Sequence, residues 1–205
     1  MSADRREHWE AVWRERAPGE LSWHQETAER SFALITASLG RPDAAIIDVG
    51  GGDSPLTGDL ARYGYHDLTV LDIADAALDH GRRRLGPLAD AVTWITADVT
   101  AFRPERACQL WHDRAVFHFL TSGIDRSRYV EAAAAAVAPG GWLVIATFGP
   151  TGPRQCSGLP VQRHTQTSLT DALAPAFTPV EFSTEDHVTP AGDVQQFLYG
   201  RFRRS

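Results

Sequence analysis

The sequence predicts a single α/β domain in which helices cover both faces of a mostly parallel sheet. Apolar, strand-like runs alternate with helix-like segments between residues 40 and 203. This alternation is typical of right-handed βαβ units. A length of 205 residues also suits one domain with a substantial core. We therefore expect one α/β core over residues 40–205 that follows an N-terminal segment, residues 1–30.

The stretch that organises the domain is residues 44–56, AAIIDVGGGDSPL. Its apolar start is typical of a strand that is buried on both faces. Gly50, Gly51 and Gly52 then predict a tight turn that a ligand can approach closely, because no Cβ stands in the way. Pro55 suits the first turn of a helix. The stretch therefore predicts strand, turn and helix, and the turn is either a ligand-binding loop or only a tight connection.

Three acidic residues mark the ends of successive strand-like runs. Asp48 stands near the end of the first run, Asp72 closes the run 67–73 and Asp98 follows the run 92–97. Open α/β sheets bind ligands at the edge where the carboxyl ends of parallel strands meet. An acid placed like Asp72 accepts two hydrogen bonds from the diol of a ribose. One such acid is commonly a loop cap, but three in register predict a nucleoside-binding edge.

The pattern Asp48-x-Gly50-x-Gly52 resembles motif I of the class I S-adenosylmethionine (SAM) methyltransferases. A dinucleotide fingerprint would instead have a third glycine at position 55, where this chain has proline. The resemblance implies a seven-stranded, Rossmann-like fold, SAM as the cofactor and S-adenosylhomocysteine (SAH) as the product. In that family, the acid at the place of Asp98 usually faces the adenine amino group. The residues that the resemblance assigns to the cofactor in this part of the chain are Asp48, Gly50, Gly51, Gly52, Asp72, Ile73, Asp98, Val99 and Asp113.

The first thirty residues contain three tryptophans. Trp9 and Trp13 lie one helical turn apart and therefore share a face of the predicted N-terminal helix. Trp23 follows a Pro-Gly break, before a second helix predicted over residues 27–39. The indole rings either fix the helix to the core or form a lid over the cofactor. An aromatic face attracts a sulfonium ion through its negative quadrupole, which favours a lid.

The N-terminal pattern gives a more specific resemblance. Trp-x-x-x-Trp, a short loop and then Trp23-His24-Gln25-Glu26 resemble the N-terminus of the thiopurine S-methyltransferase family and its bacterial relatives. The likeness extends over about residues 8–150. In that family the segment covers the SAM site, which implies that all three tryptophans contact the cofactor. It also implies a small-molecule acceptor with a soft nucleophile, such as a thiol or a related selenium or metalloid group.

The predicted fourth strand carries the next candidate residues, in CQLWHDRAVFHF over residues 108–119. Asp113 would end this strand, with Arg114 just outside. The block resembles the Trp-Asp-Arg block of thiopurine methyltransferases, whose arginine is near the substrate, and the Asp-Lys-Gly block of a set of lysine methyltransferases. His112 is inserted between the tryptophan and the aspartate, and Ala115 replaces a glycine. The plain alternative is that Asp113 and Arg114 form a surface pair or a helix cap.

Two histidines in the same block are candidate general bases, since neutral imidazole is available at pH 7. We prefer His118 over His112, because it follows the strand end rather than lying in it. The alternative for both is a scaffold role in the core. A thiol ionises with a pKa of about 8.5, so a modest shift supplies the thiolate without a base. The catalytic candidates are His118, Asp113 and Arg114.

The remaining chain predicts the rest of the sheet. A helix over residues 125–137 ends at Pro139-Gly140-Gly141, and the next strand is expected over residues 142–148. The loop 149–163, which contains Cys156, is long enough to be functional and leaves the ligand-binding edge. A helix over 169–174 and a hairpin of strands 180–187 and 195–203 then complete an antiparallel C-terminal end.

Composition narrows the functional classes. A net charge of −6 and a pI near 5.7 argue against nucleic acid as a partner. Neither a signal peptide nor a membrane-spanning run is evident. Two cysteines make neither a disulfide framework nor a metal site. We therefore expect a cytoplasmic protein that binds no metal and no membrane, as a monomer or weak dimer.

The sequence thus predicts a SAM-dependent methyltransferase that transfers a methyl group to a small-molecule nucleophile by in-line displacement. One alternative is a protein lysine N-methyltransferase, which the block around Asp113 suggests. The other is a SAM-binding regulatory or scaffold protein without turnover.

Overall fold

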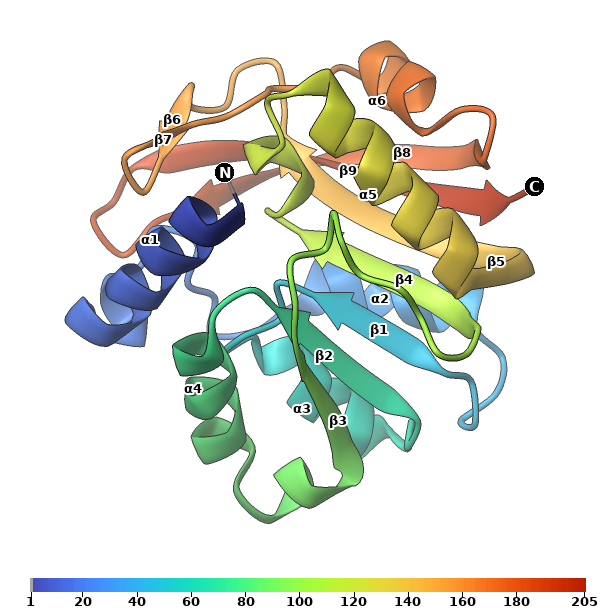
Figure 1. Cartoon of the computed structure of the whole chain (residues 1–205), viewed down its shortest axis with the longest axis horizontal. Helices are drawn as coiled ribbons and strands as arrows, with labels where there is room; N and C mark the ends of the chain where they lie inside the picture. Colours follow the sequence, from blue (N-terminus) through green and yellow to red (C-terminus); the bar gives the residue numbers. More distant parts are fainter. Residues whose placement is uncertain (1) are drawn as a thin grey trace.

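A seven-stranded sheet with the order β3-β2-β1-β4-β5-β9-β8 forms the centre of the computed structural model, which describes residues 2–205 (Figure 1). A separate ribbon of two short strands, β6 and β7, lies outside it. The strands are β1 (Ile46–Val49), β2 (Leu68–Asp72), β3 (Val92–Thr96), β4 (Cys108–Arg114), β5 (Val137–Phe148), β6 (Gln155–Cys156), β7 (Leu159–Pro160), β8 (Phe177–Val188) and β9 (Val194–Arg204). The α-helices are α1 (Ser2–Glu15), α2 (Glu29–Ser38), α3 (Pro55–Tyr63), α4 (Asp75–Leu85), α5 (Gly123–Ala136) and α6 (Gln166–Leu173). Short 3-10 helices are η1 (Pro18–Glu20), η2 (Gly86–Ala91) and η3 (Phe117–Phe119).

The strand pairing confirms the predicted fold class. β1 lies between β2 and β4, and all pairs from β3 to β5 are parallel. β9 runs antiparallel to both β5 and β8, which is the expected C-terminal hairpin. The strand order reverses between β1 and β4, and open α/β sheets bind ligands at such a switch point.

Alternating side chains of β4 show how the sheet is buried on both faces. Leu110 packs in a core cluster with Leu56 of α3, whereas its neighbour Trp111 packs in another with Tyr129 and Ala133 of α5. Accordingly α2, α3 and α4 contribute to one cluster, and α5 and α6 to the other. Burying one such leucine stabilises the fold by about 1.5–3 kcal/mol. These layers fix where each strand ends, and hence where the predicted acids lie.

Helix ends follow recognisable capping signals. The side chain of Ser54 accepts a hydrogen bond from the backbone N–H of Leu56 at 3.2 Å, and Pro55 occupies the first turn of α3. The helix stops at Gly64, whose φ of 118° lies in the region that favours glycine. Thr165 and Ser168 form a capping box, so α6 begins at residue 166 rather than at 169 as predicted.

Two further segments differ from the sequence-based expectation in more than their end residues. β5 begins at Val137, before the Pro-Gly-Gly sequence, because Val137 already pairs with Cys108; the register then shifts, which leaves the extra residues as a bulge. The loop 149–163 contains the ribbon of β6 and β7. Ser157 and Gly158 join these strands with φ angles of 50° and 77°, which is typical of a tight hairpin turn.

No helix within residues 2–205 is long and apolar enough to cross a membrane.

Candidate active site

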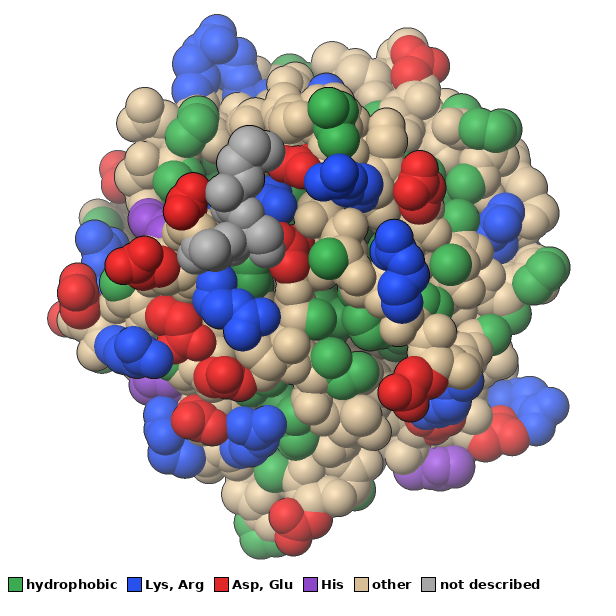
Figure 2. All heavy atoms as spheres, viewed as in Figure 1, with side chains coloured by type: hydrophobic (Ala, Val, Ile, Leu, Met, Phe, Trp, Pro, Cys, Tyr) green, Lys and Arg blue, Asp and Glu red, His purple; other side chains and the backbone are tan. Residues whose placement is uncertain are grey.

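A cavity of about 850 Å³, counting its open mouth, lies at the carboxyl ends of the parallel strands. α1 forms one wall, and the turns after β1, β2, β3 and β4 form the opposite wall. Figure 2 shows hydrophobic side chains in the middle of the view, with arginine and acidic side chains around them. Of the residues predicted from sequence, this main cavity brings together Trp9, Trp13, Trp23, Gly50, Asp72, Ile73, Asp98, Val99 and Arg114.

A second cavity, of about 520 Å³, lies beside the glycine turn. It is lined by Asp48, Gly51 and His112, and also by the first turn of α3. Trp13, Trp23, Val49, Gly50 and Arg114 line both cavities. Gly52, Asp113 and His118, which were also predicted as site residues, line neither.

The turn after β1 accepts only glycine at its first two positions. Gly50 has a φ of 65°, and a Cβ there would stand 2.2 Å from a methyl carbon of Val116. A Cβ at Gly51 would stand 2.6 Å from Oδ2 of Asp48. Both distances are shorter than any real carbon contact. The turn is therefore packed against its own strand and against the turn after β4, and its backbone borders both cavities.

Asp72 ends β2 as a buried carboxyl group that lines the main cavity. Its Oδ1 accepts a hydrogen bond from the backbone N–H of Ala74 at 3.0 Å. A Cβ at Gly52 would stand 3.1 Å from its other oxygen, so the glycine turn and the acid are adjacent. Burial raises the pKa of Asp72 to about 7, and the negative charges of Asp48 and Glu10 act in the same direction. The site therefore holds a buried carboxyl group that faces the cavity and whose pKa lies close to neutral pH.

Asp98 connects the cavity with the N-terminal helix. Its Oδ1 accepts hydrogen bonds from the backbone N–H and the hydroxyl of Thr100, at 2.9 and 2.8 Å. Its Oδ2 pairs with Arg5 of α1 at 3.0 Å, and the same guanidinium pairs with Asp125 of α5 at 3.2 Å. Arg5 was not among the predicted residues. The sequence nevertheless contains a pattern that could have identified it: Arg5, Trp9 and Trp13 are spaced four residues apart and therefore share one helical face.

The aromatic side chains of the N-terminal segment form one cluster beside the cavity. The ring of Trp23 meets Trp9 and Trp13 edge-to-face, with centroids 5.7 and 6.0 Å apart. Trp9 also contacts Phe119 at 4.9 Å. Glu10 accepts a hydrogen bond from the backbone N–H of Asp75 at 2.6 Å and so ties α1 to the start of α4. The helix is thus held by an ion pair, a cap and ring contacts along the side that faces the cavity.

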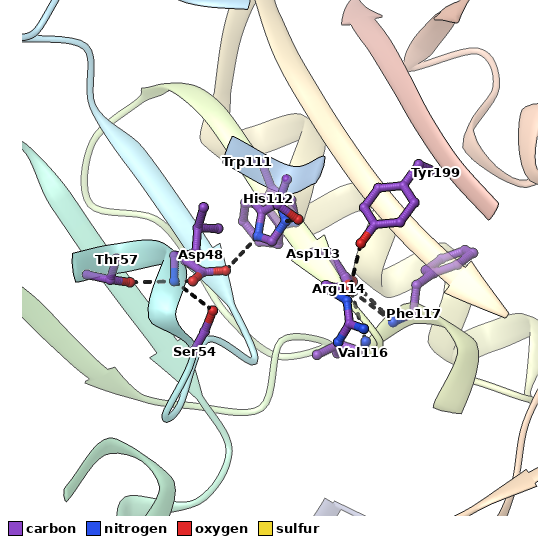
Figure 3. Close-up of polar contacts among 12 residues, drawn as sticks. Asp48, Ser54, Thr57, Trp111, His112, Asp113, Arg114, Val116, Phe117 and Tyr199 are labelled. Atoms are coloured by element: carbon purple, nitrogen blue, oxygen red, sulfur yellow. Dashed lines mark hydrogen bonds and ion pairs between the residues drawn. The ribbon is translucent and has the colours of Figure 1, made fainter. Parts of the chain in front are cut away.

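Arg114 is the cationic group where the two cavities meet. Its Nε donates to the hydroxyl of Tyr199 at 3.3 Å (Figure 3), and its Nη1 donates to the carbonyl of Trp23 at 3.1 Å. The guanidinium lies 4.3 Å above the ring of Phe197. Its buried Nη2 has no hydrogen-bond partner among residues 2–205. A buried, charged donor with unused capacity is suited to an anionic ligand group.

Beyond Arg114 the main cavity becomes apolar. Its lining there consists of Val116, Phe119, Leu120, Phe148, Cys156 and Phe197. Phe148 and Phe197 face each other across the pairing of β5 with β9, a contact that residues 49 positions apart do not reveal in the sequence. The Sγ of Cys156, from the ribbon of β6 and β7, lies 3.6 Å from the hydroxyl of Ser22. Burial raises the pKa of this thiol.

The structure does not bring Asp113 to either cavity. This carboxylate is fully buried and accepts hydrogen bonds from the backbone N–H groups of Val116 and Phe117, at 2.9 and 3.1 Å (Figure 3). It also accepts a hydrogen bond from the hydroxyl of Tyr129 at 2.7 Å. Burial raises its pKa to about 6. Asp113 therefore fixes the turn after β4, which corresponds to the cap alternative rather than to contact with a ligand.

His118 is likewise turned into the core. It lies in η3, and its Nδ1 accepts a hydrogen bond from the backbone N–H of Phe148 at 3.2 Å. The two rings stack with centroids 4.2 Å apart. Burial lowers the pKa of His118 to about 3, so the ring does not readily take up a proton. The expectation that it follows the strand end was met, but the 3-10 turn carries it away from the cavity.

His112 is buried between two polar partners. Its Nδ1 lies 2.7 Å from Oδ1 of Asp48 (Figure 3), and its Nε2 lies 2.8 Å from the hydroxyl of Ser31. The hydroxyl of Thr57 approaches the other oxygen of Asp48 at 3.5 Å. Both ring nitrogens are therefore engaged, and Ser31, a residue of α2 that the sequence did not single out, completes the set.

Both the sequence and the fold of this chain resemble those of known methyltransferases. Residues 46–141, from β1 into β5, match the model of the family described as a methyltransferase domain. No curated protein matches the sequence significantly. One similar solved structure comes from work on the conversion of a disulfide bond into a thioacetal group during echinomycin biosynthesis. It has a TM-score of 0.78 and 21% sequence identity, and the match covers 97% of this chain and 91% of that chain.

Two further structures contain bound SAH. The N-methyltransferase NodS from Bradyrhizobium japonicum WM9 has a TM-score of 0.72 and 21% identity, with 96% of this chain and 98% of that chain covered. The 1,6-didemethyltoxoflavin N1-methyltransferase from Burkholderia thailandensis, which also contains 1,6-didemethyltoxoflavin, has a TM-score of 0.71 and 20% identity, with 99% and 85% covered. These matches do not single out the thiopurine family. The chain therefore has the class I SAM-dependent methyltransferase fold, and residues 46–141 carry the sequence features of its methyltransferase domain.

Proposed function

We propose that the chain is a SAM-dependent methyltransferase whose acceptor is a small molecule with a soft nucleophile, a thiol or a related selenium or metalloid group. One observation carries the proposal: a single cavity joins a glycine turn and two strand-end acids to an apolar, aromatic end that contains one cation. Gly50, Asp72 and Asp98 line the first part, and Arg114 borders the second. The SAH-bound relatives, one of which also holds a small-molecule substrate, support this assignment.

The residues at the glycine end fit the cofactor. In this proposal Asp72 accepts hydrogen bonds from the ribose hydroxyls, and Ile73 and Val99 contact the nucleoside from the turns that follow β2 and β3. Gly50 brings the backbone of the turn to the cavity wall. The rings of Trp9 and Trp23 line the cavity, where aromatic faces suit a sulfonium. When bound, SAM supplies an activated methyl group.

The apolar end suits an uncharged or anionic acceptor. We infer that Nη2 of Arg114 holds a thiolate, since a neighbouring cation lowers the pKa of a thiol and so increases the ionised fraction. The flanking phenylalanines exclude water, and the fixed guanidinium aligns the nucleophile for in-line attack. A separate base is not needed, and the buried His118 is not proposed as one.

The same geometry disfavours the lysine alternative. At the acceptor end the described lining consists of apolar side chains, Cys156 and the guanidinium of Arg114. A lysine ammonium would meet a like charge there, which disfavours its binding. Nothing at this end resembles the open acidic groove that a basic peptide requires.

The acceptor is identified by a screen with radiolabelled SAM against aryl and alkyl thiols, phenols, amines and a lysine-containing peptide. We expect transfer to thiols, reduced roughly ten- to hundredfold by Arg114→Gln, because a charge-assisted hydrogen bond to the reacting group is lost. Transfer to the lysine peptide alone would establish the alternative enzyme. SAM binding without transfer to any acceptor would instead support the regulatory or scaffold role.

Cofactor choice is tested separately by titration calorimetry. We expect SAM and SAH to bind and NAD not to bind, because the turn lacks the third glycine of a dinucleotide fingerprint. Tight binding of NAD without SAM would overturn the methyltransferase assignment.

A further inference from the structure

Three buried polar side chains beneath the glycine turn have no part in the chemistry proposed above. Asp48, His112 and Ser31 are 3%, 2% and 1% exposed, respectively. The imidazole of His112 bridges the other two, with 2.7 Å from Nδ1 to the carboxylate and 2.8 Å from Nε2 to the hydroxyl. The three residues belong to β1, β4 and α2. One imidazole therefore connects three elements directly below the turn.

This set has the order of a Ser-His-Asp nucleophile relay, but its position excludes that role. Ser31 is almost fully buried and lines neither cavity. Its hydroxyl lies 2.8 Å from Nε2 of His112. A nucleophile must reach a substrate carbonyl, and this hydroxyl faces only protein groups. The three residues therefore do not react with a substrate themselves, and any role in function must come from the neighbouring groups that they keep in position.

The imidazole of His112 keeps the carboxylate of Asp48 in place, and this carboxylate lies against the glycine turn. A Cβ at Gly51 would stand 2.6 Å from Oδ2 of Asp48, so the carboxylate and the turn are in tight contact. Asp48, Gly51 and His112 line the second cavity together. Without His112, the nearest remaining partner of the carboxylate would be Thr57, at 3.5 Å. A buried charge left that poorly paired is costly, and it would move and take the turn with it.

We propose that His112 is a positioning residue for the cofactor: its imidazole holds the Asp48 carboxylate against the glycine turn, and the hydroxyl of Ser31 fixes the orientation of the ring. The inference rests on the proposed binding of SAM. It assigns a role to the histidine that stands between Trp111 and Asp113 in β4.

Two variants test the role through SAH binding, measured by titration calorimetry, which needs no known acceptor. Ser31→Ala removes one partner of the ring and is expected to raise the Kd roughly fivefold, the equivalent of one hydrogen bond. His112→Leu removes the bridge and is expected to raise the Kd roughly ten- to hundredfold. In both variants the number of binding sites per folded chain should stay the same, because the glycine turn shifts but the domain remains folded.

Two controls separate positioning from stability. His112→Asn retains a side-chain N–H for Asp48 and should recover most of the affinity. His164→Leu removes a histidine that is also buried, at 3% exposure, but that lines neither cavity. It should lower the melting temperature and leave the Kd unchanged.

A purely structural role predicts the opposite signature. If His112→Leu and Ser31→Ala reduce the melting temperature or the number of sites while the Kd stays at the wild-type value, the inference is overturned. Should His112→Leu fail to fold, Ser31→Ala and His112→Asn decide the question by themselves. If the wild-type chain binds neither SAM nor SAH, the proposed function fails, and this inference falls with it.

Discussion

At the scale of single residues, the site combines buried charges that are only partly compensated. Asp72 and Arg114 both line the main cavity; Nη2 of Arg114 is buried without a hydrogen-bond partner among residues 2–205, and Asp72 is a carboxyl group whose pKa is raised by burial. Leaving such groups in a folded core costs free energy, which ligand contacts can offset. Asp48 and Asp113 differ from them, because their carboxylates are tied to protein donors. We therefore interpret Asp72 and Arg114 as ligand-binding residues and Asp48 and Asp113 as residues that position the backbone, a distinction that the sequence does not make.

Asp72→Asn should weaken SAH binding and stabilise the empty protein. The folded-state pKa of about 7 is above the unfolded value near 4, so the folded state binds the proton more tightly, and wild-type stability falls as pH rises between these values. At pH 8 the ionised carboxylate costs roughly 2–4 kcal/mol, which the neutral amide avoids. We expect a higher melting temperature at pH 8, no gain at pH 4, and a Kd raised roughly ten- to hundredfold. An unchanged Kd would place Asp72 outside the site.

The same carboxyl group should make cofactor affinity depend on pH. If the ionised form accepts both ribose hydroxyls, affinity falls by roughly tenfold for each pH unit below about 7. The measurement is SAH binding by calorimetry between pH 5.5 and 8.5. Asp72→Asn serves as the control and should give a nearly flat profile. A wild-type profile as flat as that of the variant would contradict the assignment.

At the scale of elements, the sequence predicted strand ends better than the turns that follow them. Asp48, Asp72 and Asp98 lie at the cavities because apolar runs define parallel strands, whose carboxyl ends share one edge. Asp113 and His118 obeyed the same rule but do not reach a cavity. After β4 the chain turns through η3. The hydrophobic periodicity of the sequence predicts neither the path of this short helix nor the hydrogen bonds that fix the turn, so the direction of these two side chains could not be predicted.

Contacts between distant elements were also beyond sequence reasoning. The pairing of β5 with β9 brings aromatic rings into the cavity, and α1 supplies an arginine to the acids after β3 and on α5. Each depends on the register and docking of elements that are far apart in the chain. A short hairpin within loop 149–163 escaped prediction for another reason: two residues per strand give no detectable alternation.

α1 is an element whose attachment can be tested directly. If α1 is a lid over the sulfonium, residues 5–28 should exchange amide hydrogens faster without SAM than with it. Ordering such a segment is entropically costly, and cofactor contact offsets part of that cost. Hydrogen exchange with and without SAM measures the difference. Equal protection in both states would mean that the tryptophans only fix the helix to the core.

The ion pairs of Arg5 should control how firmly this lid is held. Arg5→Gln removes the pairs with Asp98 and Asp125, so exchange in α1 should increase in the absence of SAH. Arg6→Gln is the matched control, because its side chain is exposed and lies one position along the same helix. Similar exchange in both variants would show that the aromatic contacts alone hold α1.

At the scale of the whole molecule, the sheet leaves two edges, β3 and β8. β8 is the longer edge, with 12 residues, and an exposed edge strand is a template for pairing with another chain. This edge carries features that oppose such pairing. Pro179 has no N–H to offer, the register shifts beside it, and Glu181 and Asp186 are exposed along the strand. A net charge of −6 adds repulsion between copies.

We therefore expect a monomer of 22.5 kDa at micromolar concentration, and an edge that associates once its charges are removed. The double variant Glu181→Val and Asp186→Val would remove both charges, and the ion pair of Glu181 with Arg201, and would leave β-branched residues on both faces of the edge strand together with Val180 and Val188, which are already 49% and 63% exposed. Sedimentation should then show dimers or larger species, weakened little by salt, because the new contact is apolar rather than ionic. As a control, Glu7→Val and Glu15→Val remove two negative charges from exposed positions of α1, outside the sheet edge, and should leave the monomer intact. If the edge variant stays monomeric, Pro179 and the bulge protect the edge by themselves, whereas a wild-type dimer would show that these features do not protect it at all.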